Sequence, residues 1–583
     1  MRRLILLAAV CITAIFSVSA QTVSIDKARQ VAKNMYFERA SMQGQVNAKD
    51  ISVVSEYTIS QNFMPVYYVF NIGNNKGFVI VSADERTVPV LSYAFEGTYS
   101  NYNQPENFVS WMNNYKLQIA YARDNNIAQS EEATALWNRY AAETIELSKG
   151  TNAVTPLLGA IAWDQGCYYN EKCPTAPMYG MCTRYPTGCV ATAMAMIMKY
   201  HGWPAHGYGT HSYVHTIANG YPNNCGTLAA PCGTTNYAWS SMPSELTSSS
   251  STTQKNAVAT LIYHCGVTIN TSYDTDGSGA FVADCQEALT YHFIYNASYE
   301  SKFSYTDAAW KAKIKANLDA ARPILYAGSD PSGTSAGHCF VLDGYQGSGN
   351  DYFHFNWGWS GMYNSYNYLS AITPGGVGTG GGNGDFTYDQ QAVMDIYPAN
   401  PSVPVANFTA NKTNIVTGDF VNFTNSSTGG LDYLWTVTPN TGLTWMSATT
   451  PTSVSPRIKF GTAGNYTVVL KATNSAGSNT KTRSSYIHVS GGSGIEDASI
   501  SAQITIGPNP STGSFMINTG AIDAMHLKVD VYNLIGQKQS GYSCAATGNS
   551  SLRADLTGLA SGIYCIVFTC SEGSASKKVQ IIR

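Results

Sequence analysis

The sequence predicts two α+β units followed by two β-sandwiches, arranged one after another along the chain. Its 583 residues are too many for a single hydrophobic core, so several domains are expected. Helix and strand patterns are mixed up to residue 399, whereas short alternating strands dominate after it. Charged residues make up only 12% of the chain, about half of the ~25% that is usual in soluble proteins. This composition, with 44% hydrophobic residues, is typical of a secreted, loop-rich and β-rich protein.

The N-terminus has the pattern of a secretion signal. Two arginines precede the apolar run 4–16, and the small residues 18–20 form a cleavage site. We therefore expect residues 1–20 to be removed and the mature chain to start at Gln21, outside the cytoplasm. No other stretch is apolar enough to be a stable membrane span. The net charge of −3 favours neither nucleic acid nor an anionic membrane as a partner.

Residues 21–150 form the first α+β unit. Helix periodicity covers 23–40, and the apolar segments 67–72 and 77–82 are predicted to pair as strands across a tight turn. Residues 107–145 return to helical patterns. An accessory domain that stays attached is one interpretation of this unit, and the resemblance described below implies another.

Cys189 is the first candidate for a chemical role. It follows a turn at Gly188 and begins an uninterrupted helical pattern of small and apolar residues that runs to His201. A thiol at a helix N-terminus faces the positive end of the helix dipole, which favours the thiolate. The neighbouring backbone N–H groups are also placed to hold an oxyanion. The alternative is a buried cysteine that only packs among alanines.

A cysteine nucleophile needs a histidine from elsewhere in the chain. His338 begins an apolar strand pattern, and Gly337 before it allows another chain to approach closely. Asn356 is placed to orient the imidazole through a hydrogen bond, and Trp357 to shield that bond from water. Gln165 carries a side-chain amide of the kind that lines an oxyanion hole.

These segments together resemble the streptopain family of papain-like cysteine peptidases. The matching strings are W-D-Q at 163–165, T-G-C-V-A-T-A-M-A-M-I-M-K-Y-H at 187–201, G-H-C-F-V-L-D-G at 337–344 and H-F-N-W-G-W-S-G at 354–361. The resemblance covers about residues 21–399. It implies a two-lobed, papain-like α+β catalytic domain at 151–399. It also implies that residues 21–150, with the string G-F-V-I-V-S-A-D, are an inhibitory prodomain that is cut off near 150–155.

The resemblance also implies roles for single residues. Cys189 would be the nucleophile, His338 the general base and acid, and Gln165 the oxyanion donor. Asn356 and Trp357 would support the histidine. The glycine-rich segment around Ser278, together with Gly337, is a candidate for the wall of the substrate cleft. One departure is Cys339, where a small apolar residue is usual, and we interpret it as a buried strand residue. The chemistry needs neither a metal nor an organic cofactor.

The cysteine pattern favours disulfides or free thiols over a metal site. The chain has 13 cysteines, and no pair has the C-x2-C spacing of a zinc site. Cys167 with Cys173, and Cys225 with Cys232, flank short loops, so local bridges are expected in an oxidising compartment. Sequence alone leaves the connectivity open.

The remainder of the chain is predicted to form two immunoglobulin-like β-sandwiches. Residues 402–490 resemble the polycystic-kidney-disease (PKD) family of domains, with Trp435 as the core tryptophan. A Gly/Ser linker at 491–494 follows. Residues 503–583 carry the P-N-P-x-x-G-x-F string and resemble the C-terminal sorting domain of the type IX secretion system of Bacteroidetes. That resemblance implies the type IX machinery as a partner, with export through the periplasm to the medium or the cell surface.

The sequence thus predicts a secreted cysteine endopeptidase that is made as a zymogen. Its expected partners are protein or peptide substrates and its own prodomain. One alternative is a surface adhesin or haemagglutinin-like protein that binds through the C-terminal domains, but it leaves the set of Cys189, His338 and Gln165 unexplained. A transglutaminase or amidase on the same scaffold is the nearer alternative.

Overall fold

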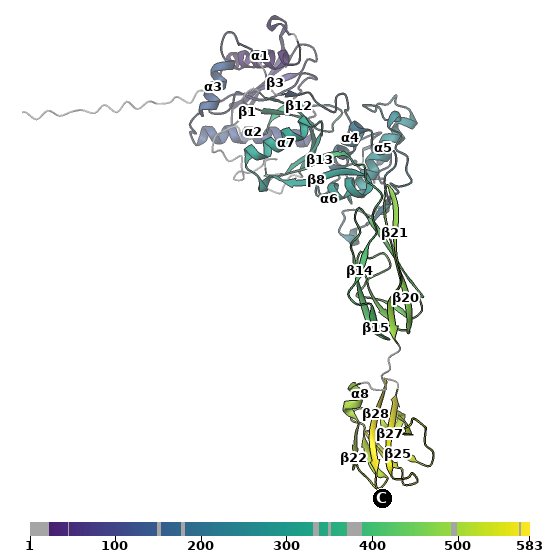
Figure 1. Cartoon of the computed structure of the whole chain (residues 1–583). Helices are drawn as coiled ribbons and strands as arrows, with labels where there is room; N and C mark the ends of the chain where they lie inside the picture. Colours follow the sequence, from purple (N-terminus) through teal and green to yellow (C-terminus); the bar gives the residue numbers. More distant parts are fainter. Residues whose placement is uncertain are drawn as a thin grey trace, which may run out of the picture. The chain divides into compact units, whose positions relative to one another are not determined.

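A computed structural model describes most of the chain. The described residues are 22–44, 46–147, 153–176, 181–329, 337–347, 351–369, 388–490, 498–570 and 573–583. They divide into two compact units, within 1–402 and 403–583, and both are drawn in Figure 1. The predicted signal peptide and the linker at 491–494 lie outside the described residues.

The N-terminal region of the first unit has the predicted mixture of helices and strands. Ser24 caps the first helix, because its hydroxyl accepts a hydrogen bond from the Lys27 N–H. The predicted strand pair is confirmed, with Tyr67 opposite Ser82 in an antiparallel ladder. The predicted helical stretch 107–145 is divided into two helices. The elements are α1 (Ile25–Ser41), β1 (Val53–Gln61), β2 (Met64–Ile72), β3 (Phe78–Ser82), β4 (Val90–Tyr93), α2 (Glu106–Asp124) and α3 (Glu131–Tyr140).

One long sheet connects this region to the predicted catalytic domain. Its strand order is β1-β2-β3-β4-β12-β11-β10-β9-β13-β8, and β5 also pairs with β10. The junction is the antiparallel pairing of β4 with β12, in which Tyr93 lies opposite Tyr366. The further strands are β5 (Ala153–Val154), β8 (Tyr295–Ser301), β9 (Ile324–Ser329), β10 (His338–Gly347), β11 (Asp351–Asn356), β12 (Ser365–Tyr368) and β13 (Tyr388–Pro398).

The two faces of this sheet belong to different hydrophobic cores. Side chains alternate along β10, so Cys339 and Val341 pack with the helices α4 (Cys189–His201) and α5 (Thr252–Thr268). Phe340 lies on the opposite face, in a core with α7 (Asp307–Asp319) and the N-terminal helices. The expected two lobes are therefore the helical layer around α4 and the sheet itself.

The core that contains Phe340 includes side chains from both sides of the predicted domain boundary at residue 150. It contains Val31 and Trp111 from the N-terminal region together with Phe355 and Tyr366 from the catalytic region. The predicted prodomain, residues 21–150, thus packs against the catalytic region. The segment shares one continuous core with the catalytic sheet, because the strand pairing of β4 with β12 brings the two aromatic faces together.

The second unit, 403–583, is built from strands in two successive regions. In the first region two four-stranded sheets enclose one core. Trp435 lies in that core with 2% of its surface exposed, as predicted, and its indole N–H donates to the Ser453 carbonyl. The sheets are β14 (Phe408–Ala410), β16 (Phe420–Asn425), β19 (Arg457–Phe460) and β18 (Leu443–Met446), and β15 (Asn414–Val416), β21 (Gly477–Ser490), β20 (Gly464–Asn474) and β17 (Asp432–Thr438).

The C-terminal region has a separate core, which includes Phe515, Val531 and Phe568. A short helix, α8 (Ala498–Gln503), precedes its strands. One sheet contains β22 (Thr505–Gly507), β23 (Ser514–Asn518), β26 (Ser551–Asp555) and β25 (Ser543–Gly548), and the other contains β24 (Lys528–Asn533), β27 (Gly562–Cys570) and β28 (Gly573–Ile581). None of the described helices combines the length and the apolar character needed to cross a membrane.

Candidate active site

Cys189 is the first residue of α4, directly after a tight turn. Gly188 precedes it with φ of 87°, a conformation that side chains with a Cβ rarely adopt. A Cβ on Gly188 would lie 2.8 Å from the carbonyl oxygen of Ser278. The glycine therefore lets the chain around Ser278 approach the nucleophile turn. This places the predicted cleft residue Ser278 beside the turn that precedes Cys189, with its side chain largely buried.

The predicted oxyanion donor, Gln165, lies in a loop that is tied to the same turn. The Thr187 N–H donates to the Gln165 carbonyl at 3.0 Å. The carboxylate of Asp164 accepts hydrogen bonds from the Gln165 and Gly166 N–H groups and from the Ser360 hydroxyl. The backbone N–H and the carbonyl of Gln165 are thus both hydrogen-bonded. The bond to Thr187 ties the Gln165 loop to a residue two positions before Cys189.

A disulfide joins Cys167 to Cys182 across the loop that follows Gln165. This corrects the expected local bridges, because Cys173, Cys225 and Cys232 are free thiols in the structure. Cys173 and Cys232 are buried in the core around α4, where they pack as small apolar side chains. The spacing of the cysteines along the chain did not predict that Cys167 pairs with Cys182 instead of Cys173.

His338 begins β10, and its ring is stacked in an aromatic cluster. The imidazole lies 4.8 Å from the Trp359 ring and 5.9 Å from the Trp357 ring, centroid to centroid. Its Nε2 is 3.1 Å from the Trp357 carbonyl oxygen. A carbonyl only accepts hydrogen bonds, so Nε2 carries a proton and Nδ1 is the basic nitrogen of the neutral ring. Gly337, the other predicted cleft residue, is exposed directly before it.

Asn356 makes other hydrogen bonds than the one predicted for it. Its amide nitrogen donates to the Ile161 carbonyl at 2.8 Å, and its amide oxygen accepts from the Gly358 N–H. The hydrogen bond expected from Asn356 to the imidazole is instead made by the backbone of Trp357. Asn356 therefore braces the loop that carries the Trp357 carbonyl, and it supports the histidine indirectly.

The surroundings of the Cys189 thiol and of the His338 imidazole favour the uncharged form of each group. Burial raises the pKa of the Cys189 thiol, although the backbone N–H groups of Cys339 and Val190 act in the opposite direction. Burial lowers the pKa of His338 to about 4. The neutral thiol and the neutral imidazole are therefore favoured at pH 7. Desolvation thus opposes the thiolate that the helix dipole favours.

The N-terminal region contacts the aromatic cluster around His338. The rings of Trp111 and Phe108, both on α2, lie 5.8 Å and 6.3 Å from the Trp357 ring. Trp111 also packs against Phe355 at 5.2 Å. Neither these contacts nor the stacking of Trp359 on His338 was predicted from the sequence. The signal for Trp359 was present in the string H-F-N-W-G-W-S-G, whereas nothing in the local pattern around Trp111 pointed to a partner so far along the chain.

Comparison with known proteins identifies the family. The model of the peptidase C10 family matches residues 163–367, a segment that contains Gln165, Cys189 and His338. Streptopain from Streptococcus pyogenes is 33% identical over 341 residues, which cover 57% of this chain and 80% of streptopain. The chain belongs to the peptidase C10 family. Membership places it among the cysteine peptidases.

Two further matches extend beyond the C10 peptidase region. Residues 20–119 match the model described as Spi protease inhibitor, and residues 505–582 match the secretion system C-terminal sorting domain. The first match shows that the N-terminal region of this C10 peptidase is inhibitor-like. The second indicates a secreted or cell-surface location.

Other proteins similar to this C10 peptidase come from Porphyromonas gingivalis and Prevotella intermedia. Thiol protease/hemagglutinin PrtT from Porphyromonas gingivalis is 32% identical over 390 residues, which cover 66% of this chain but only 43% of PrtT. A solved structure of a prointerpain A fragment from Prevotella intermedia is 28% identical and covers 59% of this chain and 99% of the fragment, with a TM-score of 0.46.

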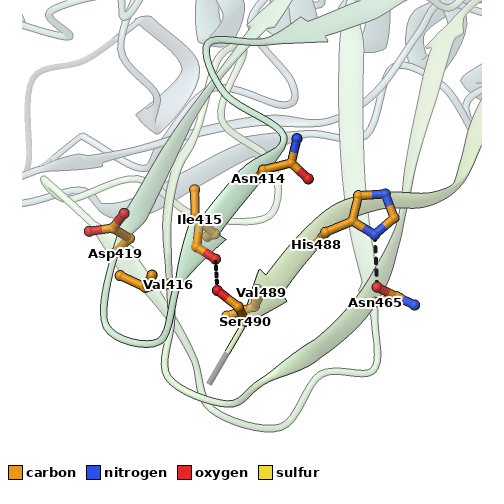
Figure 2. A pocket seen from close by; sticks show the side chains of 8 residues that line it. All are labelled: Asn414, Ile415, Val416, Asp419, Asn465, His488, Val489 and Ser490. Atoms are coloured by element: carbon orange, nitrogen blue, oxygen red, sulfur yellow. Dashed lines mark hydrogen bonds between the residues drawn. The ribbon is translucent and has the colours of Figure 1, made fainter. Parts of the chain in front are cut away.

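A separate hollow of about 560 Å³ lies in the second unit of this C10 peptidase, at the edge of β15 and β21. Figure 2 shows the His488 ring bonded to Asn465 and the Ser490 hydroxyl bonded to the Ile415 carbonyl. The lining residues are Asn414, Ile415, Val416, Asp419, Asn465, His488, Val489 and Ser490. They include no cysteine, so the hollow offers no thiol chemistry. Within the described part of the chain, no group of three or more His, Cys, Asp or Glu side chains is arranged to hold a metal ion.

Proposed function

We propose that this chain is a secreted cysteine endopeptidase that is made as a zymogen and cleaves peptide bonds through Cys189 and His338. The observation that carries the proposal is the arrangement around the N-terminus of α4. Cys189 lies there, the Gln165 loop is bonded to Thr187, and Cys339, next to His338, belongs to the core against which Cys189 packs. The chemistry is acyl transfer without a cofactor.

The reaction proceeds in two halves. The Cys189 proton passes to His338 as the sulfur bonds to the substrate carbonyl carbon, and the oxyanion is held by the Cys189 N–H and the Gln165 side chain. His338 then protonates the leaving amine as the C–N bond breaks. Water, deprotonated by His338, attacks the thioester, releases the carboxylic acid and restores the thiol. Casein cleavage by the activated chain, and its loss after treatment with a thiol alkylator, tests this proposal.

The N-terminal region acts as the inhibitor of the same chain in our proposal. It contacts the histidine cluster through Trp111 and Phe108, and Tyr352 of the catalytic sheet donates to the Val90 carbonyl at 2.8 Å. The ring of His338 lies over Phe340, on the face of β10 that packs against the N-terminal region. Cys339 faces α4 instead. Removal of the N-terminal region frees His338 to turn toward Cys189.

The activating cut is expected before residue 153. The backbone of Ala153 and Val154 pairs with β10, and the Leu157 N–H donates to the Asp343 carbonyl at 2.7 Å. A peptidase needs an extended, accessible segment, so cleavage after residue 152 would require these hydrogen bonds to break. We therefore place the cut at the N-terminal end of the predicted region 150–155. These residues lie outside the described part of the chain.

We predict that the segment 21–150 inhibits the activated enzyme in trans and that Trp111→Ala weakens this inhibition about 100-fold. Trp111 is 2% exposed, and a buried tryptophan at an interface contributes about 2–4 kcal/mol. Inhibition constants are measured with a fluorogenic peptide, and circular dichroism verifies that each segment is folded.

Tyr102→Ala is the matched control, because Tyr102 is an aromatic residue of the same segment with 78% of its surface exposed. It should inhibit as the unchanged segment does. A folded, unchanged segment that leaves the rate unaltered at high excess would contradict the inhibitor assignment. Equal inhibition by the Trp111 and Tyr102 variants would contradict the role of Trp111.

Residues from about 503 onward serve export in our proposal. Their core is separate from the core around Trp435, so their loss should not unfold the neighbouring region. We predict that deletion of 503–583 leaves peptidase activity in a cell lysate but retains the protein inside the outer membrane of its host. Cell fractionation measures this. Truncated protein in the medium or on the cell surface at the level of the full-length chain would overturn the assignment.

A further inference from the structure

Two buried threonine hydroxyls lie on either side of the nucleophile. Thr187 and Thr192 are each 1% exposed, and their hydroxyl oxygens are 2.7 Å apart. The reaction proposed above uses neither of them. Buried hydroxyls that bond to each other deep in a helix layer are costly unless every partner is satisfied, so the pair calls for a structural or functional reason.

The direction of the hydrogen bonds follows from the count of protons. The Thr192 hydroxyl donates its only proton to the Gly188 carbonyl at 2.9 Å. Thr187 must therefore be the donor in the bond between the two hydroxyls. The Gly188 carbonyl also accepts the Thr192 N–H at 3.1 Å. Thr192 thus holds the carbonyl of the residue before Cys189 with both its backbone and its side chain.

This fixed carbonyl sets the direction of the Cys189 N–H. The Gly188 carbonyl and the Cys189 N–H belong to one planar trans peptide, in which they point in opposite directions. When the carbonyl is held toward Thr192, inside the helix, the N–H points out of the helix N-terminus. That is the direction in which an oxyanion donor is needed, and first-turn N–H groups have no acceptor within the helix.

The same pair reaches the other elements of the site. The Thr187 N–H holds the Gln165 carbonyl at 3.0 Å. The Thr192 methyl carbon lies 3.4 Å from the position of a Cβ on Gly358, and Gly358 follows Trp357, whose carbonyl bonds to His338. Thr192 is therefore in contact with the nucleophile turn and with the loop that positions the histidine.

We propose that the Thr187–Thr192 hydroxyl pair positions the oxyanion donors of this peptidase, with Thr192 as the principal residue. The proposal rests on the proposed function, because it assigns the Cys189 N–H to the oxyanion. A hydroxyl that bonds back to the carbonyl four residues earlier is common in helices. Thr268 in α5 makes such a bond, to His264 at 2.9 Å, far along the chain from Cys189. Thr268 is therefore the matched control.

The test uses full-length chains that carry Thr192→Val, Thr192→Ser or Thr268→Val and are activated by a trace of wild-type enzyme. Active sites are titrated with a thiol-directed irreversible inhibitor. Loss of one oxyanion donor lowers kcat about 10²–10³-fold. In Thr192→Val the Cys189 N–H would be misdirected but not lost, so we expect kcat to fall about tenfold or more, with KM little changed. Thr192→Ser, which keeps the hydroxyl, should restore most of kcat, and Thr268→Val should match wild type.

Two probes separate oxyanion binding from thiol reactivity. A peptide aldehyde forms a tetrahedral adduct with an oxyanion, so its affinity for Thr192→Val should fall in the same proportion as kcat. Iodoacetamide alkylation generates no oxyanion, so its rate with Cys189 should stay within about twofold of wild type. Should Thr192→Val fail to fold, Thr187→Val removes only the supporting donor and should show the same pattern with a smaller loss.

Unchanged kcat and aldehyde affinity in Thr192→Val would overturn the proposal. So would an equal loss in Thr268→Val, because it would show a general effect of removing such bonds from helices. A fall in alkylation as large as the fall in kcat would also overturn it, since the defect would then lie in the thiol. Failure of the proposed function has a different signature, namely peptide cleavage that survives the alkylation of Cys189.

Discussion

Cys189→Ala removes peptide cleavage, with kcat falling on the order of 10⁶-fold as it does when other peptidases lose their nucleophile. The sulfur is the only atom lost, and the thiol lies at the helix start beside the Gly188 turn, so the fold should be retained. Because self-processing depends on the same thiol, the purified variant should remain full length. Casein hydrolysis and the size of the purified chain measure both outcomes.

Cys339→Ala is the control for this prediction. Cys339 is a buried strand residue with 2% exposure, as we expected from the sequence, and the proposed reaction does not use its thiol. The variant should keep its activity once folded. A Cys189→Ala protein that cleaves casein at the wild-type rate would show that Cys189 is not the nucleophile. An inactive but folded Cys339→Ala protein would show that the second thiol matters.

His338→Ala should be as damaging as the loss of Cys189, and combining the two should add little. Residues that act as one catalytic unit are strongly non-additive. Trp357→Ala should be intermediate, because it removes a ring stacked on the imidazole and exposes the histidine to water. Asn356→Ala should be the mildest, because its amide acts through the loop carbonyl and not on the ring.

We would measure kcat and KM for each single variant and for the double variant of Cys189 and His338. Where a variant keeps the Cys189 thiol, kcat is corrected for the concentration of titrated active sites. Circular dichroism controls for folding, which matters most for Trp357 because it lies in the shared core. If Asn356→Ala is the most damaging of the three histidine-site variants, the assignment of His338 as base is wrong. A double variant much less active than either single variant would show that the two residues act independently.

Local patterns in the sequence were sufficient for several features. A glycine turn followed by a run of small residues predicted α4 with Cys189 at its start, and alternating apolar residues predicted the pairing of β2 with β3. The burial of Trp435 and Cys339 was also predicted. These features depend on backbone propensity and on side-chain periodicity within about ten neighbouring residues, so they can be derived without knowing the rest of the fold.

Other features depend on contacts between distant segments, and only the tertiary structure decided them. The pairing of β4 with β12 joins the N-terminal region to the catalytic sheet and creates the shared core. The Cys167–Cys182 bridge and the use of the Trp357 carbonyl by His338 likewise depend on which loops meet in space. The protonation of the site follows the same logic, because desolvation is a property of everything packed around Cys189 and His338 and no local pattern reports it.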